Sequence, residues 1–344
     1  MRGKGICYDT GFFNRGVSTH EPFDPEVVGR ELRIIAGDLH CNAVRITGGD
    51  PERLRVAAGH AAEAGLEVWI SPFTTDLTGD ELLDFLAGCA EQAERLRRQG
   101  AEVVLLTGSE LSVVNRGIVP GEAFENRVAF LTPSNPQLGQ VLTAVPARVN
   151  DLLAKAVTVV RGRFGGRVSY ASLPFERVDW TPFDVVSTDA GYRSIESADR
   201  YADDVRALVA QGRPVAITEF GCCTYRGAAD RGAHGVDIVE WDAATVTPVR
   251  LDGDYLRDED EQATYLREVL DVLTAAGVDS AFVYTFARYD LPHRSDPRLD
   301  LDMASAGVVK VLEGGRGQTY PDMAWEPKAA FAALADYYRD EPST

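Results

Sequence analysis

The stretch RLRRQGAEVVLLTGSEL, residues 95–111, contains one complete structural transition of this chain. A basic, helix-forming run ends at Gly100, a mostly apolar run follows over residues 102–107, and an acid stands just beyond it at Glu110. Glycine commonly ends a helix, and a short apolar run rich in valine and leucine is typical of a buried strand. The stretch therefore predicts a helix, then a buried strand with a carboxylate at its carboxyl end.

The same alternation recurs along the whole chain. Eight short apolar segments are each followed by a stretch with helical periodicity, which is the pattern of repeated βα units. Asp24, Asp50 and Thr78 stand where capping side chains would start three of the helices. No GxGxxG turn follows the first segment, so eight units in 344 residues favour a closed (β/α)8 TIM barrel over an open doubly wound sheet. The predicted strands are residues 5–9, 42–47, 67–71, 102–107, 167–171, 184–188, 214–218 and 280–285.

Three connections are longer than ordinary βα loops. They follow the fourth, seventh and eighth predicted strands and span residues 110–136, 220–255 and 286–325. All three belong at the carboxyl ends of the strands, where barrel enzymes have their active sites. Within the second, residues 246–255 contain an Asp-Gly pair and predict a small hairpin or an irregular lid. No linker or low-complexity tract divides the chain, so we expect one domain over residues 1–344.

Composition excludes some classes of partner. A net charge of −18 opposes nucleic acids and anionic membrane surfaces, both of which favour clustered Lys and Arg. No long apolar run predicts a membrane span or a signal peptide, and three of the five cysteines, Cys7, Cys41 and Cys89, fall in predicted core elements. We therefore expect a reduced, cytoplasmic protein with a small-molecule partner. Cys222 and Cys223 are interpreted as packing or loop thiols.

Two glutamates stand at the ends of predicted strands. Glu110 follows the fourth strand, and Glu219 follows the seventh within ITEFG, residues 217–221. In a barrel, carboxylates from these strands would converge on one cavity. Such a pair suits glycoside cleavage, in which one acid protonates the leaving oxygen and a second carboxylate attacks or stabilises the sugar cation.

These motifs resemble a large clan of (β/α)8-barrel retaining glycoside hydrolases, clan A. The resemblance rests on ITEFG, on NAVRI at residues 42–46, and on the placement of Glu110. It implies that Glu219 is the nucleophile, that Glu110 is the acid/base, and that Arg45 keeps the nucleophile ionised. The chain is also similar to bacterial proteins labelled abortive infection proteins, a label that specifies no chemistry.

The chain departs from the clan pattern at two places. Ser109 stands where the clan usually has an asparagine that binds the sugar 2-hydroxyl, and the sixth strand ends in STDAGYRS rather than in a His-x-Tyr pattern. Asp189 and Tyr192 are the candidates in that segment, with Tyr192 expected to hydrogen-bond Glu219. Together with Arg45 and Ser109, they are included in the predicted substrate site. Six aromatic residues are candidates for stacking on a sugar, and we expect one or two of them to do so: Tyr8, Phe73, Trp180, Tyr284, Phe286 and Trp325. The last three are included in the predicted substrate site.

Other barrel chemistries fit less well. None of the four lysines stands at a strand end, as a Schiff-base enzyme requires, and the five histidines are scattered without metal-ligand spacing. We therefore expect no cofactor and no metal, and a retaining glycoside hydrolase or transglycosylase acting on a β-linked glycoside or small oligosaccharide. The retaining mechanism predicts Glu110 and Glu219 carboxyl groups roughly 5 Å apart. The alternative hypothesis is a catalytically inactive barrel of this type that binds a carbohydrate or a protein partner.

Overall fold

The computed structural model describes residues 1–340 and contains the predicted barrel. Eight parallel strands occur in the order of the sequence, and each predicted strand is present with small shifts at its ends. The prediction of a (β/α)8 TIM barrel is therefore confirmed. The strands are β1 (Gly3–Asp9), β4 (Ala43–Gly48), β5 (Glu67–Pro72), β6 (Val103–Ser109), β7 (Arg167–Ala171), β8 (Val186–Thr188), β9 (Val215–Phe220) and β12 (Ser280–Val283).

The barrel is nearly closed, with its weakest seam between β7 and β8. Strand β1 pairs with both β4 and β12, whereas β7 and β8 meet through one parallel bridge between Ser172 and Thr188. The hydroxyls of Ser169 and Ser187 lie 2.6 Å apart across the same seam. The barrel interior is filled by a compact set of buried side chains: Cys7, Ala43, Trp69, Val104, Leu106, Ala171, Val185, Ala216 and Phe282.

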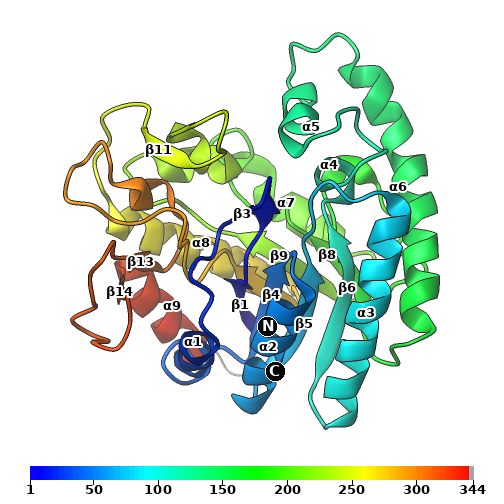
Figure 1. Ribbon diagram of the computed structural model, residues 1–344, viewed down its shortest axis with the longest axis horizontal. Helices are drawn as coiled ribbons and strands as arrows, with labels where there is room; N and C mark the ends of the chain where they lie inside the picture. Colours follow the sequence, from blue (N-terminus) through cyan, green and yellow to red (C-terminus); the bar gives the residue numbers. More distant parts are fainter. Residues whose placement is uncertain (341–344) are drawn as a thin grey trace.

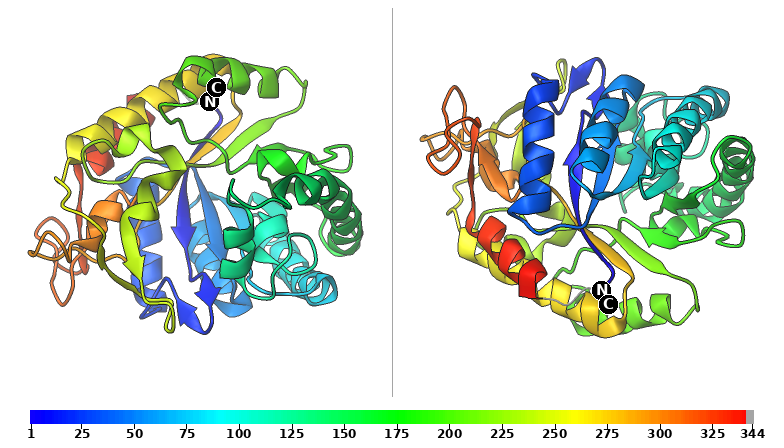
Figure 2. Two further views of the ribbon diagram at one scale, coloured as in Figure 1. Left: turned by 90° about the horizontal axis from the view of Figure 1, so that it is seen from above. Right: turned by 90° about the horizontal axis from the view of Figure 1, so that it is seen from below.

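Helices surround the strands, as the views along the barrel show (Figure 2). Three of them begin at the predicted caps: Asp24 and Asp50 accept backbone N–H bonds from the first turn, and Thr78 forms a reciprocal capping box with Glu81. The outer helices are α1 (Pro25–Gly37), α2 (Pro51–Glu63), α3 (Gly79–Arg98), α6 (Leu138–Arg161), α7 (Ala198–Val209), α8 (Glu259–Ala276) and α9 (Ala329–Asp340).

The connection between β7 and β8 differs from the other seven. It carries only a 3₁₀ turn, η1 (Pro174–Glu176), where the other barrel strands are followed by an outer α-helix. The turn packs against α6. This short connection places the buried Glu176 near the carboxyl end of β7 instead of on an outer helix.

The three long connections gather at one end of the barrel. In Figure 1, α5 and β11 lie at the end opposite to the two chain termini. A hairpin is present, but not over the predicted residues 246–255. Strand β10 (Val239–Trp241) pairs with β11 across a turn at residues 242–247, so the Asp-Gly pair follows the hairpin instead of forming its turn. The segments in these connections are α4 (Leu111–Val114), α5 (Phe124–Phe130), η2 (Ala228–Asp230), η3 (Gly232–Ile238), β10 (Val239–Trp241), β11 (Pro248–Leu251), η4 (Leu301–Ala304), β13 (Val309–Val311) and β14 (Trp325–Pro327), and the first loop adds the hairpin of β2 (Phe13–Asn14) and β3 (Val17–Ser18).

A buried ion network joins the second and third long connections. Lys328 is fully buried, and its Nζ lies 2.9 Å from the Asp302 carboxylate and donates to Thr224 Oγ1 at 2.8 Å. Arg257 pairs with Asp302 at 2.9 Å and with Asp300 at 2.7 Å. Because a buried cation without a counter-charge is costly, these pairs hold the two connections together.

Within residues 1–340, no helix combines the length and the apolar character needed to cross a membrane. All five cysteines are buried and carry free thiols.

Replacing Asp302 by Asn should lower the free energy of unfolding by about 3 kcal/mol, because the charges of Lys328 and Arg257 lose their shared carboxylate. Urea denaturation measures the change. The matched control is Asp336→Asn, which breaks the exposed pair with Arg339 and should leave the unfolding free energy nearly unchanged. Equal effects of the two variants would contradict the assignment of the network as a stabilising link.

Candidate active site

A cavity of about 670 Å³ opens at the carboxyl ends of the strands. Glu110, Asp189, Tyr192, Glu219 and Tyr284 line it, so five of the nine predicted site residues come together there. They arrive on different elements of the barrel: Glu110 directly follows β6, Asp189 directly follows β8, and Glu219 lies within β9.

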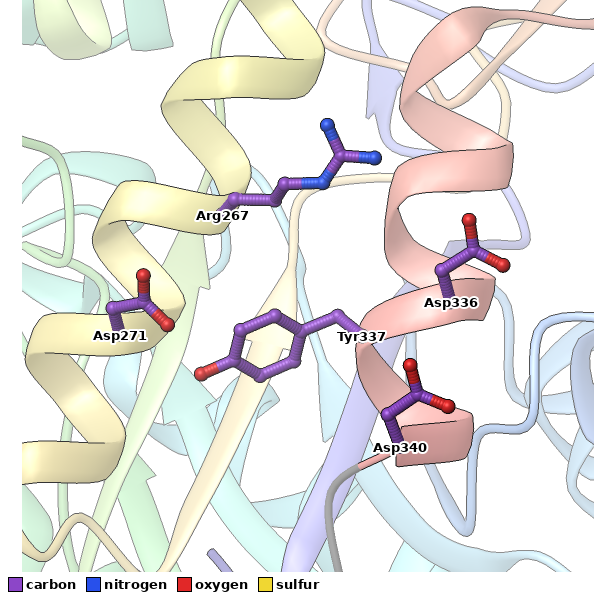
Figure 3. Close-up of a pocket in the computed structure, with 5 residues that line it drawn as sticks. All are labelled: Arg267, Asp271, Asp336, Tyr337 and Asp340. Atoms are coloured by element: carbon purple, nitrogen blue, oxygen red, sulfur yellow. The ribbon is translucent and has the colours of Figure 1, made fainter.

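The structure has another hollow, of about 340 Å³, on the outside of the barrel between α8 and α9 (Figure 3). Arg267 and Asp271 enter it from α8, and Asp336, Tyr337 and Asp340 enter it from α9. None of the predicted site residues lies there. The cavity at the barrel mouth is therefore the candidate active site.

Arg45 forms the base of this site. Its guanidinium is fully buried on β4 and donates to Glu219 Oε1 at 2.9 Å and to Asp189 Oδ1 at 2.9 Å. The same group donates to Ser71 Oγ at 3.1 Å and to the Thr218 carbonyl at 3.0 Å. Arg45 is thus held from several strands at once, and it does not line the cavity itself.

Ser109 and Asp189 complete the layer around Arg45. The Ser109 hydroxyl accepts from Arg45 Nη2 at 2.9 Å and donates to Asp189 Oδ2 at 2.7 Å. Ser109 is buried, and the Asp189 side chain has 0% of its surface exposed. The expectation of direct substrate contact is therefore corrected for Arg45, Ser109 and the Asp189 carboxylate. Their polar atoms are bonded to one another beneath the cavity surface.

Glu219 reaches the cavity from this layer. It keeps 8% of its surface exposed, and its second oxygen accepts from the Tyr192 hydroxyl at 3.4 Å, as predicted for Tyr192. Burial raises the pKa of Glu219 above its usual range, the charge of Asp189 raises it further, and Arg45 opposes both. One guanidinium is shared by two carboxylates, so Arg45 lowers the pKa less than the sequence-based expectation assumed.

Glu110 has a different environment. Its backbone is in the left-handed region, with φ 48° and ψ 38°, a conformation that costs a non-glycine residue about 1–2 kcal/mol. Among the described residues, none donates a hydrogen bond to its carboxyl group. Burial raises the pKa of Glu110 well above its usual range, and the charges of Asp189, Glu219 and Glu176 add to that shift, whereas Arg45 opposes it. The two glutamates therefore differ in their partners: Glu219 is paired with a cation, whereas Glu110 is an unpaired acid. The pKa of both is raised.

Two predicted aromatic residues lie elsewhere. Phe286 and Trp325 are fully buried, with ring centroids 5.3 Å apart, and neither lines the cavity. The Trp325 Nε1–H donates to the buried Glu31 carboxylate at 2.7 Å. The expectation that these two residues bind substrate is corrected, because the connection after β12 folds back over α1 and encloses them in the core.

An aromatic wall, most of which the sequence did not predict, forms part of the cavity. Phe12, Phe73 and Phe124 line the cavity, and Phe12 contacts the other two edge to face, with ring centroids 5.1 and 5.5 Å apart. Phe73 was among the aromatic candidates, whereas Phe12 and Phe124 come from separate connections that only the fold brings together. Cys222 and Cys223, expected as packing thiols, also line the cavity while remaining almost fully buried.

Within residues 1–340, no group of three or more His, Cys, Asp or Glu side chains is arranged to hold a metal ion.

The sequence matches no protein-family model and no curated relative. Its structure is similar to several glycoside hydrolases of known structure. A GH113 β-mannanase from Alicyclobacillus acidocaldarius matches with 15% identity and TM-score 0.57, over 98% of this chain and 97% of that one. A β-glucosidase, 1317, matches with 11% identity and TM-score 0.55, over 99% of both chains. A β-glucuronidase from Parabacteroides merdae matches with 14% identity and TM-score 0.58, over 99% of this chain but 37% of the larger enzyme. The chain thus has the (β/α)8 fold of these glycoside hydrolases.

Replacing Glu110 by Gln should make stability less sensitive to pH. A carboxyl whose pKa is raised in the folded state keeps its proton after the unfolded chain has lost it, so the folded state loses stability as pH rises above about 4.3. The variant lacks this loss. Its free energy of unfolding should therefore rise relative to that of the wild type by up to about 1.4 kcal/mol for each pH unit between pH 5 and 8. Urea denaturation at both pH values measures it. The control is Glu122→Gln, an exposed acid in the same connection. A difference between wild type and Glu110→Gln that does not change with pH would contradict the raised pKa.

Proposed function

We propose that this protein is a retaining glycoside hydrolase or transglycosylase acting on a β-linked glycoside, with Glu219 as the nucleophile and Glu110 as the acid/base. The observation that carries the proposal is the contrast between these two glutamates in one cavity. Glu219 is hydrogen-bonded to Arg45 and Tyr192, whereas Glu110 has no hydrogen-bond partner among the described residues. Burial raises the pKa of both carboxyl groups, and the hydrogen bonds from Arg45 and Tyr192 oppose that rise at Glu219. This contrast suits an ionised nucleophile beside a protonated acid.

In the first step, the Glu110 carboxyl donates its proton to the glycosidic oxygen while a Glu219 oxygen attacks the anomeric carbon. The bond to the leaving group breaks, and a glycosyl ester forms on Glu219. In the second step, the Glu110 carboxylate takes a proton from water or from a sugar hydroxyl, and that oxygen displaces Glu219 from the anomeric carbon. Both steps require carboxyl groups about 5 Å apart.

The Arg45 layer supports the nucleophile in two ways. The guanidinium stabilises the Glu219 carboxylate, and the buried contacts with Asp189 and Ser109 hold the guanidinium in place. Tyr192 donates to the other oxygen of Glu219 and fixes the rotation of the carboxylate. Because burial and Asp189 raise the pKa of Glu219, we expect activity to be lost on acidification at a higher pH than for an ordinary glutamate.

The cavity also bears on the substrate class. The similar structures are described as a β-mannanase, a β-glucosidase and a β-glucuronidase, all named for β-linked glycosides, and this supports the β configuration as a proposal. The Phe12, Phe73 and Phe124 wall offers apolar surface to the C–H face of a sugar ring. Tyr284 and Arg288 line the cavity as polar groups that suit sugar hydroxyls.

A second candidate function is carbohydrate binding without chemistry. The observation that favours it is the orientation of Ser109, which bonds to Arg45 and Asp189 and therefore leaves no hydroxyl for a sugar at that position. The pairing of Glu219 with Arg45 favours catalysis instead, because a barrel used only for binding gains nothing from a buried, charge-paired carboxylate beside an unpaired acid.

The test is the intact mass of the protein after incubation with activated 2-deoxy-2-fluoro β-glycosides of glucose, mannose, galactose and glucuronic acid. The wild type should form a stable adduct with at least one sugar, and Glu219→Gln should form none, because the fluorine slows the hydrolysis of the glycosyl ester. The exposed variant Glu63→Gln serves as the control and should be labelled like the wild type.

Glu110→Gln sharpens the test. With a dinitrophenyl glycoside, whose leaving group needs no proton, the variant should still form the glycosyl enzyme. Turnover of glycosides with poor leaving groups should fall by about 10²- to 10⁴-fold. Sugar binding without an adduct or turnover anywhere in the panel would favour the second candidate function.

A further inference from the structure

Glu176 is an unusual buried acid near the proposed active site. It ends the 3₁₀ turn η1, has none of its surface exposed, and does not line the cavity. In the part of the chain that the structure describes, no Lys, Arg or His forms an ion pair with it. A buried carboxyl group without a cation must be held by hydrogen bonds alone, so its partners indicate what it does.

The partners of Glu176 are close to Glu110 in sequence or in space. Glu176 Oε1 accepts from the Ser112 backbone N–H at 3.1 Å, and Oε2 accepts from the Leu173 backbone N–H at 2.8 Å. The Tyr170 hydroxyl lies 2.9 Å from both carboxyl oxygens and accepts from the Leu111 backbone N–H at 2.8 Å. Tyr170 and Glu176 therefore bind the two consecutive amides that directly follow Glu110.

The backbone on the other side of Glu110 is tied to the same segment. The Glu110 N–H donates to the Ala171 carbonyl at 2.9 Å, at the end of β7. Three successive amides, those of Glu110, Leu111 and Ser112, are thus bound by Ala171, Tyr170 and Glu176. The left-handed conformation of Glu110 lies at the centre of these bonds. A residue persists in such a conformation only when its surroundings impose it.

We propose that Glu176, acting with Tyr170, is a positioning residue for Glu110: it holds the left-handed turn that directs the Glu110 carboxyl into the cavity. The inference rests on the proposed function of Glu110 as the acid/base. The negative charge of Glu176 also favours the protonated form of Glu110. It adds to the effects of burial, Asp189 and Glu219, which raise the pKa of Glu110, whereas Arg45 lowers it.

The test uses the dependence of rate on the leaving group. A misplaced acid slows only reactions in which the leaving oxygen needs a proton, and a displacement of about 1 Å is enough for a loss of roughly 100-fold. The probes are the methyl and the 2,4-dinitrophenyl β-glycosides of the sugar that labels the wild type. Tyr170→Phe and Glu176→Gln should lower kcat for the methyl glycoside by about 10- to 100-fold and the rate of glycosyl-enzyme formation from the dinitrophenyl glycoside by less than about 3-fold.

Tyr170→Phe keeps the ring and the Glu176 charge but removes the hydroxyl that binds Leu111, so it serves if Glu176→Gln folds poorly. The matched control is Glu31→Gln. Glu31 is also fully buried and accepts from Tyr8, Tyr289 and Trp325, but it has no bond to the segment around Glu110. The Glu31→Gln variant should lower the free energy of unfolding. It should leave unchanged the ratio of the rate with the methyl glycoside to the rate with the dinitrophenyl glycoside.

The outcomes separate the two proposals. A changed ratio in Tyr170→Phe or Glu176→Gln, with an unchanged ratio in Glu31→Gln, supports the positioning role. Equal losses of rate with both glycosides would mean that Glu176 only stabilises the fold. That result would overturn the positioning role but not the proposed function. If Glu110→Gln itself shows no dependence on the leaving group, or if no glycoside reacts, the proposed function fails and the positioning role fails with it.

Discussion

The sharing of one buried guanidinium by two carboxylates is the constraint on which the site depends. Arg45 lies at the centre of the barrel mouth and bonds Asp189, Glu219, Ser71, Ser109 and the Thr218 carbonyl. These groups come from β5, β6, β9 and the end of β8, so the guanidinium connects strands that are far apart in the sequence. Because a single positive charge faces two acids, the layer keeps a surplus of negative charge. Burial and that surplus together raise the pKa of both Glu219 and Glu110.

The site therefore contains several unfavourable features in a small volume. Acids are buried close to one another, and Glu110 has a left-handed backbone. Interactions around the site offset these costs. Arg127, fully buried on α5, donates to the Val113 and Val114 carbonyls and to Asp76, and so it binds the connection after β6 to the connection after β5. The Lys328, Asp302 and Arg257 network does the same for the connections after β9 and β12. A rigid rim of this kind suits a cavity whose acids must be held at fixed separations.

The contrast between correct and incorrect site predictions has a physical basis. Glu110 and Glu219 could be placed at the cavity because the carboxyl ends of parallel strands meet on one face of a barrel, whatever the loops do. Phe286 and Trp325 could not be placed, because an aromatic residue in a long connection is equally suited to the core and to a cavity wall. Trp325 bonds to Glu31 on α1, which lies 294 residues away in the sequence, and Phe286 packs against Trp325. Glu176 was missed because it ends a short 3₁₀ turn that carries no sequence signal for function.

The sequence by itself determined the repeating βα units, the capped starts of the helices, the long connections and the two glutamates at the strand ends. Each of these follows from short-range patterns: apolar periodicity, the backbone preferences of glycine, and side chains that bond their own neighbouring amides. The tertiary structure alone decided that Arg45 is shared, that Ser109 faces Asp189 instead of the cavity, and that Tyr170 and Glu176 hold the turn at Glu110. Burial, hydrogen-bond partners and pKa shifts are properties of the complete environment of a group. That environment is assembled from strands and connections that only the folded barrel brings into contact.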